Sequence, residues 1–597
     1  MSLGEMKLLR GAWLACGLLC AVEAIASSAN VCSTPVREGE AAQRAVDGSS
    51  YNIRYDSIDH PVIGREGMVV TQNDLASAIG AQVLRDGGNA VDSAVAVGFA
   101  LAVTLPRAGN LGGSGFMLLH LAAEKRTIAL EYYSQAPASL RVEQLRKPDG
   151  TVDEEKRYSR LGAGIPGTVA GMWYVHQKYG TLPWKRVMQP AIELAAKGIV
   201  VSEDFAYALD VRRDRLSRDP AAAKALYKAN GESYLAGERF VQKDLAWSLR
   251  EISKGGADAF YRGSVARKIV ADMQANGGAI TMDDLARYEL REQEPIWSDY
   301  RGHRMALMPP PASGVLLAEL LNIVENFPMK ELGSNSVASI HVIAEASKRV
   351  FADRGVYFGG YPDYQVPVSG LISKTYAKSL AQTIDLTKAS DVATLKAGDP
   401  MKSESRDTTH YSIMDSAGNA VSNTYTLGSS FGAHVMVAGT GILLNDHIYN
   451  FALHGGPVIP HSLDTSAANA LAPGKRSTSA ITPVIVFQGD RPYLVSGSPD
   501  GARIIPAMAQ LIVNVVDHGL NVAEATGRPR VFQNMTSGEL ELEPGHPVDV
   551  VRLLQERGHK VKSVGNMGST QSVMCTNGRF FGGADTRRPD AAAIGVN

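Results

Sequence analysis

A pair of threonines, Thr408 and Thr409, stands where a polar stretch of the chain gives way to a β-strand pattern. If the peptide bond after Asp407 is cut, Thr408 gains a free α-amino group beside its own hydroxyl, and one residue then holds both a nucleophile and a general base. An α-amine titrates near pH ~8 and can accept the hydroxyl proton, whereas an uncut threonine stays protonated at neutral pH. The pattern predicts a self-processed enzyme that cleaves amides. The alternative is that two β-branched residues simply open a strand.

The segment after Thr408 has the pattern of a β-hairpin whose second strand carries another threonine. A three-residue turn at 416–418 pairs Asp415 with Asn419, and counting back along both strands pairs Thr408 with Thr426. A hydroxyl at that position can hold the oxygen of the nucleophile in place. An ordinary cross-strand pair of threonines is the alternative.

Two glycine-containing segments can bring the backbone close to a substrate. Residues 497–503 follow a predicted strand and turn sharply. Such a turn can direct consecutive backbone N–H groups to one point, as an oxyanion hole requires, although a plain turn fits the segment equally well. The run 109–115 is not followed by a helix or by Lys-Ser/Thr, so it indicates close backbone packing near a site better than a phosphate-binding loop.

The composition excludes several classes of function. The chain has 597 residues and a formal charge of -1, and no run of Lys or Arg could follow a phosphate backbone, so we expect no nucleic-acid partner. Its 13 histidines are scattered and no His-Glu-x-x-His, Cys-x-x-Cys or clustered acidic motif occurs, so we expect no metal and no cofactor. With 45% hydrophobic residues, a chain of this length can bury a large core and is too long for one simple domain.

The N-terminal residues have the features of an export signal. Lys7 and Arg10 precede an apolar stretch that is too short to span a membrane, and small residues follow at 24–26. We therefore expect a signal peptide at 1–26, no stable membrane anchor, and an exported protein, periplasmic or secreted. Cys32 and Cys575 remain in the mature chain, and an oxidising compartment would allow them to pair.

The spacing of apolar residues predicts the elements around these motifs. We expect helices at 73–85 and 90–103, the second apolar almost all round and therefore buried in the core, and a strand at 116–121. A mainly helical region follows at 161–353, with stops at Gly180, 255–256 and 277–278, and then an exposed connector at 390–406. After the connector strands dominate, at 410–415, 420–427, 441–445, 484–487 and 493–496.

Several of these motifs resemble those of the γ-glutamyltransferase (glutathione hydrolase) family. The similarity is carried by 109–115 and 308–314 together with the runs Thr408-Thr409-His410-Tyr411-Ser412, Gly441-Ile442-Leu443-Leu444-Asn445, Gly497-Ser498-Pro499 and Gly568-Ser569-Thr570-Gln571-Ser572. Several separate motifs in one order are far more specific than a single short match.

The resemblance implies an α/β (α+β) fold, a four-layer αββα sandwich of the N-terminal nucleophile hydrolases. The precursor would cut itself before Thr408 into a large subunit, 27–407, with helical layers and strands, and a small subunit, 408–597, which carries the nucleophile. The two subunits of one precursor would form a heterodimer.

The resemblance also assigns roles to single residues. Thr408 is the nucleophile and supplies its own amine base, Thr426 orients it, and the backbone N–H groups of Asp500 and Gly501 form the oxyanion hole. The family has glycine where this chain has Asp500, whose carboxylate would disfavour a developing negative charge unless it points away.

The donor pocket implied by the resemblance departs from the family. Family members bind the α-carboxylate of a glutamyl group with an arginine and two serines, and its α-amino group with Asn, Gln and Asp. The matching positions here are Tyr133 for the arginine, Ser479 and Ala480 for the serines, and Gly428, His447 and Asn450 for the other three. A charge-assisted contact contributes roughly 1.5–3 kcal/mol, so losing an Arg and an Asp weakens binding of a zwitterionic head group by orders of magnitude.

The leading hypothesis is an exported amide hydrolase or acyltransferase that works through an acyl-Thr408 intermediate on a small-molecule amide. Its acyl group would be glutaryl-like rather than γ-glutamyl, and family relatives that act as cephalosporin acylases are a precedent for such a shift. One alternative is an ordinary glutathione hydrolase in which Arg107 or His447 supplies the lost charge. Another is a non-catalytic binding protein on the same scaffold. A loop containing His461 is expected to cover the pocket.

Overall fold

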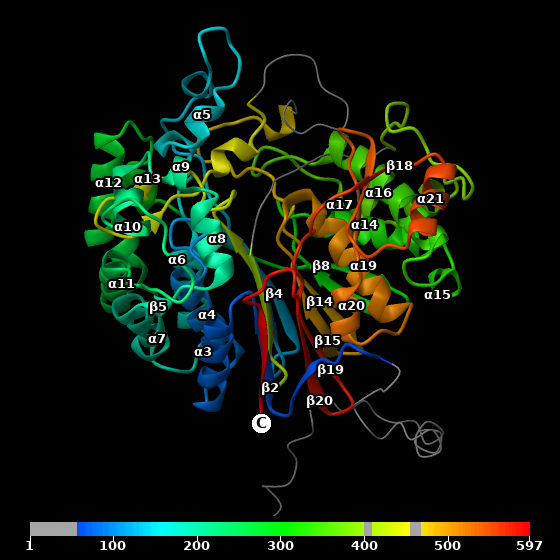
Figure 1. Ribbon diagram of the computed structural model, residues 1–597, viewed down its shortest axis with the longest axis horizontal. Helices are drawn as coiled ribbons and strands as arrows, with labels where there is room; N and C mark the ends of the chain where they lie inside the picture. The colour runs from blue at the N-terminus through cyan, green and yellow to red at the C-terminus, as the bar shows by residue number, and fades with distance from the viewer. Residues whose placement is uncertain (1–56, 399–408, 454–466) are drawn as a thin grey trace, which may run out of the picture.

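The structure is a computed structural model that describes residues 57–398, 409–453 and 467–597 (Figure 1). The expected signal peptide, Thr408 and His461 lie outside these residues, as does the end of the expected connector. Cys575 is disulfide-bonded, whereas Cys32 lies outside the described residues, so the pairing of these two cysteines stays a prediction.

Two seven-stranded antiparallel sheets form the centre of the molecule. In the order of their strands, the first sheet is β21 (Ala592–Val596), β2 (Gly67–Thr71), β10 (Thr409–Asp415), β11 (Ala420–Thr426), β3 (Ser114–Leu121), β4 (Arg126–Tyr132) and β7 (Arg291–Gln293). The second sheet is β1 (Val62–Gly64), β20 (Arg579–Ala584), β19 (Gln571–Thr576), β15 (Arg491–Ser496), β14 (Val484–Gln488), β9 (His303–Leu307) and β8 (Ile296–Tyr300).

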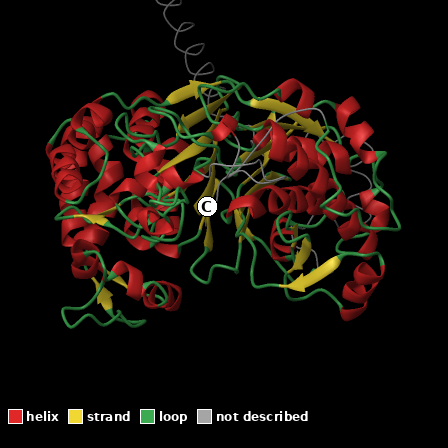
Figure 2. Ribbon diagram, turned by 90° about the horizontal axis from the view of Figure 1, so that it is seen from above, coloured by secondary structure: helices red, strands yellow, loops and turns green. Residues whose placement is uncertain are grey.

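Helices cover both sides of the paired sheets, as Figures 1 and 2 show. On one side lie α3 (Asp74–Arg85), α4 (Ala90–Thr104), α6 (Thr168–Tyr179), α7 (Trp184–Lys197), α11 (Lys243–Tyr261) and α12 (Ser264–Ala275). On the other lie α14 (Gly314–Val324), α16 (Val337–Tyr357), α19 (Ile504–Val516) and α21 (Val548–Glu556). The predicted four-layer αββα arrangement is therefore confirmed.

Helix α4 shows why the first core forms where it does. Its N-terminus is fixed by a capping box in which Asn89 and Asp92 satisfy each other's backbone N–H groups. All 15 residues of the helix are buried, because it is apolar on every side and packs among the first sheet and the neighbouring helices. This confirms that the predicted apolar helix belongs to the protein core.

The region expected to be mainly helical also contributes strands. β7, β8 and β9 lie within it, and the sequence analysis missed them because β7 and β8 are short, partly exposed edge strands without clear alternation. The expected stop at 255–256 is a kink inside α11, where Gly256 has a φ of 59°. The strand expected at 441–445 is shorter in the structure, where β13 comprises only Ile442–Leu443.

The hairpin β10–β11 has the predicted register. Thr409 lies opposite Tyr425, and the N–H of Asp415 donates to the carbonyl oxygen of Asn419 at 3.1 Å. The Asp415 carboxylate also accepts hydrogen bonds from the backbone of Ala417 and Asn419, which closes the turn. The local turn chemistry thus sets the register of the strand on which the nucleophile is predicted.

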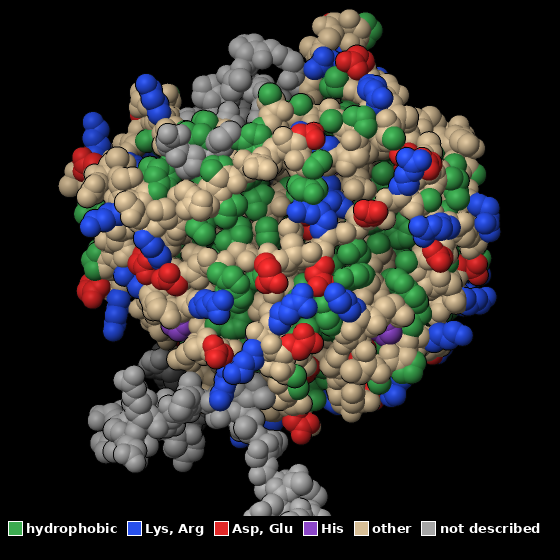
Figure 3. All heavy atoms as spheres, turned by 180° about the vertical axis from the view of Figure 1, so that it is seen from behind, with side chains coloured by type: hydrophobic (Ala, Val, Ile, Leu, Met, Phe, Trp, Pro, Cys, Tyr) green, Lys and Arg blue, Asp and Glu red, His purple; other side chains and the backbone are tan. Residues whose placement is uncertain are grey.

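The charged surface is mixed. On the face seen in Figure 3, Lys and Arg side chains are interspersed with Asp and Glu. Among the described residues, no helix has both the length and the apolar character needed to cross a membrane.

Candidate active site

Thr426 lies at the end of β11, next to the turn that leads out of the sheet. Its side chain is buried, and its hydroxyl oxygen accepts a hydrogen bond from the N–H of Gly428 at 2.7 Å. Thr409 is also buried and donates through its hydroxyl to the side-chain oxygen of Gln72 at 2.9 Å. Thr408, the predicted nucleophile, is outside the described residues, so its contact with Thr426 stays a prediction.

The turn after β15 contains the two residues that are predicted to form an oxyanion hole. Asp500 and Gly501 both have positive φ angles, 97° and 60°, and they precede helix α19. Within the described chain, no acceptor takes a hydrogen bond from the N–H of either residue. Free N–H groups at the N-terminal end of a helix are suited to bind a developing negative charge.

The Asp500 carboxylate is engaged away from these N–H groups. It accepts a hydrogen bond from the N–H of Gly568 at 3.0 Å and lies 3.3 Å from the guanidinium of Arg503. Arg503 in turn pairs with Glu541 at 2.6 Å. A positive φ angle is one that glycine adopts without strain, and the two partners hold the carboxylate of Asp500 in place.

Three of the predicted donor-pocket residues are in contact with one another. The Tyr133 ring is fully buried and stacks on Phe116 and on His447, with ring centroids 4.9 Å and 5.0 Å apart. The side-chain NH₂ of Asn450 donates to the Tyr133 hydroxyl at 3.0 Å. The position predicted to match the arginine of the family is therefore filled by an uncharged aromatic stack.

His447 is neutral in this environment. Burial lowers its pKa to about 4, and its Nδ1 lies 2.7 Å from the hydroxyl of Ser134 and 3.1 Å from that of Ser114. Its Nε2 has no hydrogen-bond partner among the described residues. The structure thus argues against the alternative in which His447 supplies a positive charge for a donor carboxylate.

Gly428 is held against a buried ion pair that the sequence analysis missed. A Cβ atom at Gly428 would lie 1.8 Å from Oδ1 of Asp446, and the φ angle there is 94°. Asp446 is fully buried, pairs with Arg157 at 2.6 Å, and accepts hydrogen bonds from the N–H and hydroxyl of Ser429. Burial alone would raise the pKa of Asp446, but these partners together lower it.

Ser479 and Ala480 are held by the segment that follows β9. Both are buried. The N–H of Ser479 donates to the carbonyl oxygen of Pro311 at 2.8 Å, and its carbonyl oxygen accepts from the hydroxyl of Ser313 at 2.7 Å. This links the 308–314 motif to the predicted pocket.

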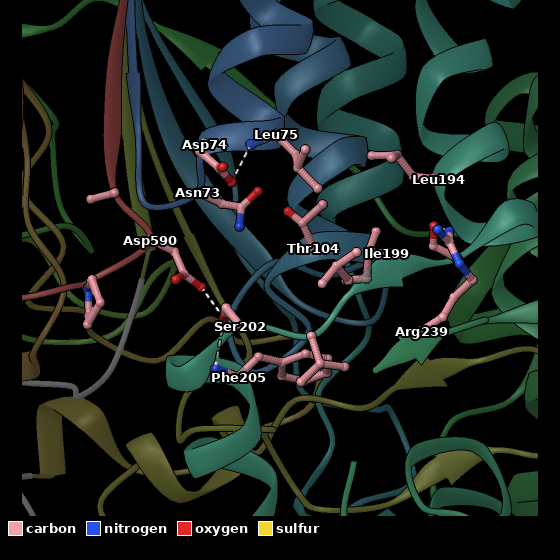
Figure 4. Close-up of a pocket in the computed structure, with 15 residues that line it drawn as sticks. Asn73, Asp74, Leu75, Thr104, Leu194, Ile199, Ser202, Phe205, Arg239 and Asp590 are labelled. Carbon is pink, nitrogen blue, oxygen red and sulfur yellow. Dashed lines mark hydrogen bonds between the residues drawn. The ribbon is translucent and has the colours of Figure 1, made fainter. Parts of the chain in front are cut away.

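Two of the cavities lined by described residues differ in how they relate to the predicted site. The smaller, of about 110 Å³, is lined by Thr426 and Gly428 and by residues 429–430. The larger, of about 530 Å³, is lined by the side chains of Asn73, Asp74, Leu75, Thr104, Leu194, Ile199, Ser202, Phe205, Arg239 and Asp590 (Figure 4). No predicted site residue borders the larger cavity, so we assign the smaller one to the candidate active site despite its size.

The described residues contain no group of three or more His, Cys, Asp or Glu side chains that could hold a metal ion. The described residues of the site offer hydroxyl groups, backbone N–H groups and a few charged side chains.

Comparisons with known proteins identify the family of this chain. The family model described as Gamma-glutamyltranspeptidase matches residues 76–595. The Glutathione hydrolase proenzyme of Escherichia coli is 42% identical over 550 residues, which cover 92% of this chain and 94% of that protein. The Acylase ACY 1 proenzyme of a Pseudomonas species is 36% identical and covers 90% of this chain and 95% of its own length.

Solved structures are similar as well. The cephalosporin acylase from Bacillus halodurans has a TM-score of 0.80 at 30% identity, covering 92% of this chain and 98% of the other. The γ-glutamyltranspeptidase of Helicobacter pylori has a TM-score of 0.54 at 39% identity and covers 58% of this chain.

Proposed function

The chain belongs to the γ-glutamyltranspeptidase family, and from this premise we propose that it is an autoprocessed amide hydrolase or acyltransferase whose donor is not a standard γ-glutamyl group. The precursor is cut before Thr408, and the fragments 27–407 and 408–597 stay together as a heterodimer. The description of the bacterial relatives as proenzymes supports this processing.

In the proposed reaction, the α-amine of Thr408 takes the proton from its own hydroxyl, and the hydroxyl oxygen attacks the carbonyl carbon of the amide. The N–H groups of Asp500 and Gly501 stabilise the negative oxygen of the tetrahedral intermediate. The C–N bond then breaks, the amine leaves with a proton, and an acyl-Thr408 ester remains. Water resolves this ester in hydrolysis, and an amine resolves it in transfer.

The state of Asp500 supports this assignment. Because its carboxylate is bound by the N–H of Gly568 and by Arg503, it is turned toward those partners. The two backbone N–H groups before α19 have no other acceptor among the described residues and can serve the oxyanion.

The observation that carries the donor assignment is the uncharged stack at Tyr133. A γ-glutamyl head brings an ammonium and a carboxylate, and the residues at the family's head-group positions offer neither an arginine nor an aspartate to bind them. Tyr133 is fully buried between two rings, and His447 has a pKa of about 4. A γ-glutamyl head would lose the hydration of two charged groups without gaining a charged partner, whereas a glutaryl group would lose that of one and a pentanoyl group that of none. We therefore assign an acyl group without the α-amino-acid head, such as glutaryl or another simple acyl chain.

Three 4-nitroanilides that share one leaving group test this proposal: glutaryl, pentanoyl and γ-L-glutamyl. We expect the purified protein to run as two fragments on a denaturing gel and to cleave the glutaryl or pentanoyl anilide with a higher kcat/KM than the γ-glutamyl anilide. Thr408→Ala is expected to stay uncut and inactive, whereas the matched Thr408→Ser variant keeps both processing and activity. Exclusive turnover of the γ-glutamyl anilide would reject the donor assignment.

The other two hypotheses give different results in the same assay. An ordinary glutathione hydrolase, the name that several relatives carry, cleaves the γ-glutamyl anilide best. A non-catalytic binding protein stays uncut and cleaves none of the three. Export of the mature chain, periplasmic or secreted, remains part of the proposal.

A further inference from the structure

The larger cavity shares no lining residue with the smaller cavity of the candidate active site. It lies where the N-terminus of α3 meets the C-terminus of α4 (Figure 4). Its other walls come from α7, β5 (Ile199–Val200), α8 (Glu203–Asp210), β6 (Arg239–Phe240) and the segment 589–591 before β21. Its volume of about 530 Å³ falls within the range of small-molecule pockets, so it is large enough for a ligand of its own.

Two carboxylates border this cavity without a cation to neutralise them. Asp590 accepts a hydrogen bond from the Ser202 hydroxyl at 2.5 Å, and Asp74 accepts one from the N–H of Leu75 at 2.7 Å. Within the described part of the chain, neither carboxylate forms an ion pair with a Lys, Arg or His side chain. One wall of the cavity is therefore acidic.

The charges around Asp590 favour a cation as its missing partner. Burial raises the pKa of Asp590, and the hydrogen bond from Ser202 opposes this rise. The negative charges of Asp204 and Asp74 raise the pKa further. Arg107 lowers it, but the Arg107 guanidinium is already paired with Asp204 at 2.5 Å. Carboxylates that lie near one another repel each other unless a cation lies between them.

Arg239 does not supply this cation. It lies at the opposite end of the cavity from Asp590 in Figure 4. Its guanidinium donates to the carbonyl oxygens of Lys197 and Gly198, at 3.3 Å and 3.1 Å, and the side chain is exposed, so water screens its charge. The cation that the acidic wall requires therefore has to come from a ligand.

Asn73 provides an independent sign of a ligand. It is 6% exposed, and its side-chain oxygen caps α3 by accepting a hydrogen bond from the N–H of Ala76 at 3.2 Å. Its side-chain NH₂ group points into the cavity in Figure 4 and has no acceptor among the described residues. The hydroxyl of Thr104, which is 3% exposed, also lacks a hydrogen-bond partner there. Buried polar groups normally have a partner, so a ligand with an acceptor oxygen fits this end of the cavity.

The remaining wall of the cavity is apolar. Leu194, Ile199 and Phe205 border it, and so do Leu75 and Val200, which are 37% and 59% exposed. An apolar group that enters the cavity would remove this apolar surface from water. The ligand should therefore combine a cation with an apolar body.

We propose that the larger cavity is a second small-molecule site, which binds β-amino alcohols with an apolar body. The ammonium group lies against Asp590 and Asp74, and the hydroxyl oxygen accepts a hydrogen bond from the Asn73 NH₂. Because Asn73 and Asp74 are consecutive residues, the cation and the oxygen of the ligand must be close together, as they are on the adjacent carbons of a β-amino alcohol. This site does not depend on the proposed function.

Four related compounds test the proposal by calorimetric titration of the purified protein at pH ~7, where alkylamines are protonated. Phenylethanolamine has all three features, whereas phenethylamine lacks the hydroxyl, phenylethylene glycol lacks the ammonium and ethanolamine lacks the ring. We expect phenylethanolamine to bind most tightly. Phenethylamine should bind about three- to tenfold more weakly, and the glycol and ethanolamine at least about tenfold more weakly.

Variants locate the bound compound. Asp590→Asn keeps an acceptor for the Ser202 hydroxyl but removes the charge, so it should weaken phenylethanolamine binding by about tenfold and leave glycol binding unchanged. Asp74→Asn should weaken it by only about two- to threefold, because Asp74 is exposed. The matched control is Asp549→Asn, which removes an exposed aspartate from the first turn of α21 and should have no effect.

A further variant tests the contact with the hydroxyl of the ligand. Asn73→Ser keeps a side-chain oxygen that can cap α3 but removes the NH₂ group. Phenylethanolamine should then bind no more tightly than phenethylamine. Thermal unfolding shows whether each variant is folded. A folded Asn73→Ser variant that still prefers phenylethanolamine would contradict the predicted contact.

Three results would overturn the proposal. One is a wild type that does not bind phenylethanolamine, and another is binding that Asp590→Asn leaves unaltered, which would place the compound elsewhere. The third is equal binding of the glycol, which would mean that the carboxylates attract no cation. Because titration needs no turnover, binding without anilide cleavage would support this site and reject the proposed function, whereas cleavage without binding would do the reverse.

Discussion

Restoring two charges of the family to the donor pocket should move the preference toward γ-glutamyl donors. The double variant Tyr133→Arg with Asn450→Asp places a guanidinium and a carboxylate where this protein has an aromatic ring and an amide. The two native side chains are already in contact, because the Asn450 NH₂ donates to the Tyr133 hydroxyl at 3.0 Å. The introduced groups can therefore pair with each other in the free protein, which limits the cost of burying them.

The magnitude follows from the interactions that the two substitutions add and remove. Each charge-assisted contact to a substrate contributes roughly 1.5–3 kcal/mol, which is about ten- to hundredfold in kcat/KM. The variant loses two ring stacks, on Phe116 and on His447, each contributing about 0.5–1.5 kcal/mol to folding. We expect the ratio of γ-glutamyl to glutaryl turnover to rise at least about tenfold while the protein loses a few kcal/mol of stability.

The assay compares kcat/KM for γ-L-glutamyl- and glutaryl-4-nitroanilide in the wild type and the variant. Thermal unfolding and the two-fragment pattern on a gel serve as controls for folding. Tyr133→Phe is the matched control, because it keeps the stacked ring, removes only the hydroxyl that Asn450 contacts, and should leave the ratio nearly unchanged. A folded, processed double variant with an unaltered ratio would show that these positions do not bind the head group.

Further predictions concern the packing beneath the site. Burial lowers the pKa of His447 to about 4, below its ordinary value, so the stability that depends on its neutral form, up to ~3 kcal/mol, is complete above pH ~6.5 and is lost as the pH falls toward 4. In denaturant unfolding, the free energy of unfolding of His447→Gln should therefore fall less steeply over this pH range than that of the wild type. Equal slopes for the two proteins would contradict this prediction. Asp446→Asn leaves Arg157 without its buried charged partner and should lower the free energy of unfolding in urea by about 3 kcal/mol at pH ~7. Because the pKa of Asp446 is lowered in the folded protein, this difference in unfolding free energy from the wild type should shrink only below pH ~4. Gly428→Ala combines a φ of 94° with a Cβ that would lie 1.8 Å from a carboxylate oxygen. It should therefore lower the melting temperature far more than Gly489→Ala, where φ is 62° but no atom lies within 4 Å of the added Cβ. Similar decreases in melting temperature for the two variants would mean that backbone strain alone matters.

The hairpin around the predicted nucleophile could be derived from sequence because its determinants are local. The turn at 416–418 is closed by Asp415, and one turn fixes the register of all the residues before it. The determinants of helix α4 are also local, because its capping residues and its apolar residues lie in one short segment of the sequence. The strands β7 and β8 could not be derived in this way, because edge strands of a few residues take their pairing from distant partners.

The residues at the donor positions could be predicted one by one from the sequence, but the contacts among them could not. Only the structure shows that Tyr133 is stacked between Phe116 and His447, since β3, β4 and the 447–450 turn meet in three dimensions. The Asp446–Arg157 pair was missed for the same reason, although the glycine at 428 was a signal that a side chain is excluded there. Sequence spacing says little about contacts between segments that are hundreds of residues apart.

The charge of the side chains at the predicted acyl positions links these observations. Tyr133 is fully buried, and burial lowers the pKa of His447 to about 4, so neither side chain offers a charge to a bound acyl group. A γ-glutamyl head would lose the hydration of two charged groups there, a glutaryl group that of one, and a pentanoyl group that of none. If charge at these positions decides which donor is cleaved, the γ-glutamyl anilide should therefore be the slowest of the three.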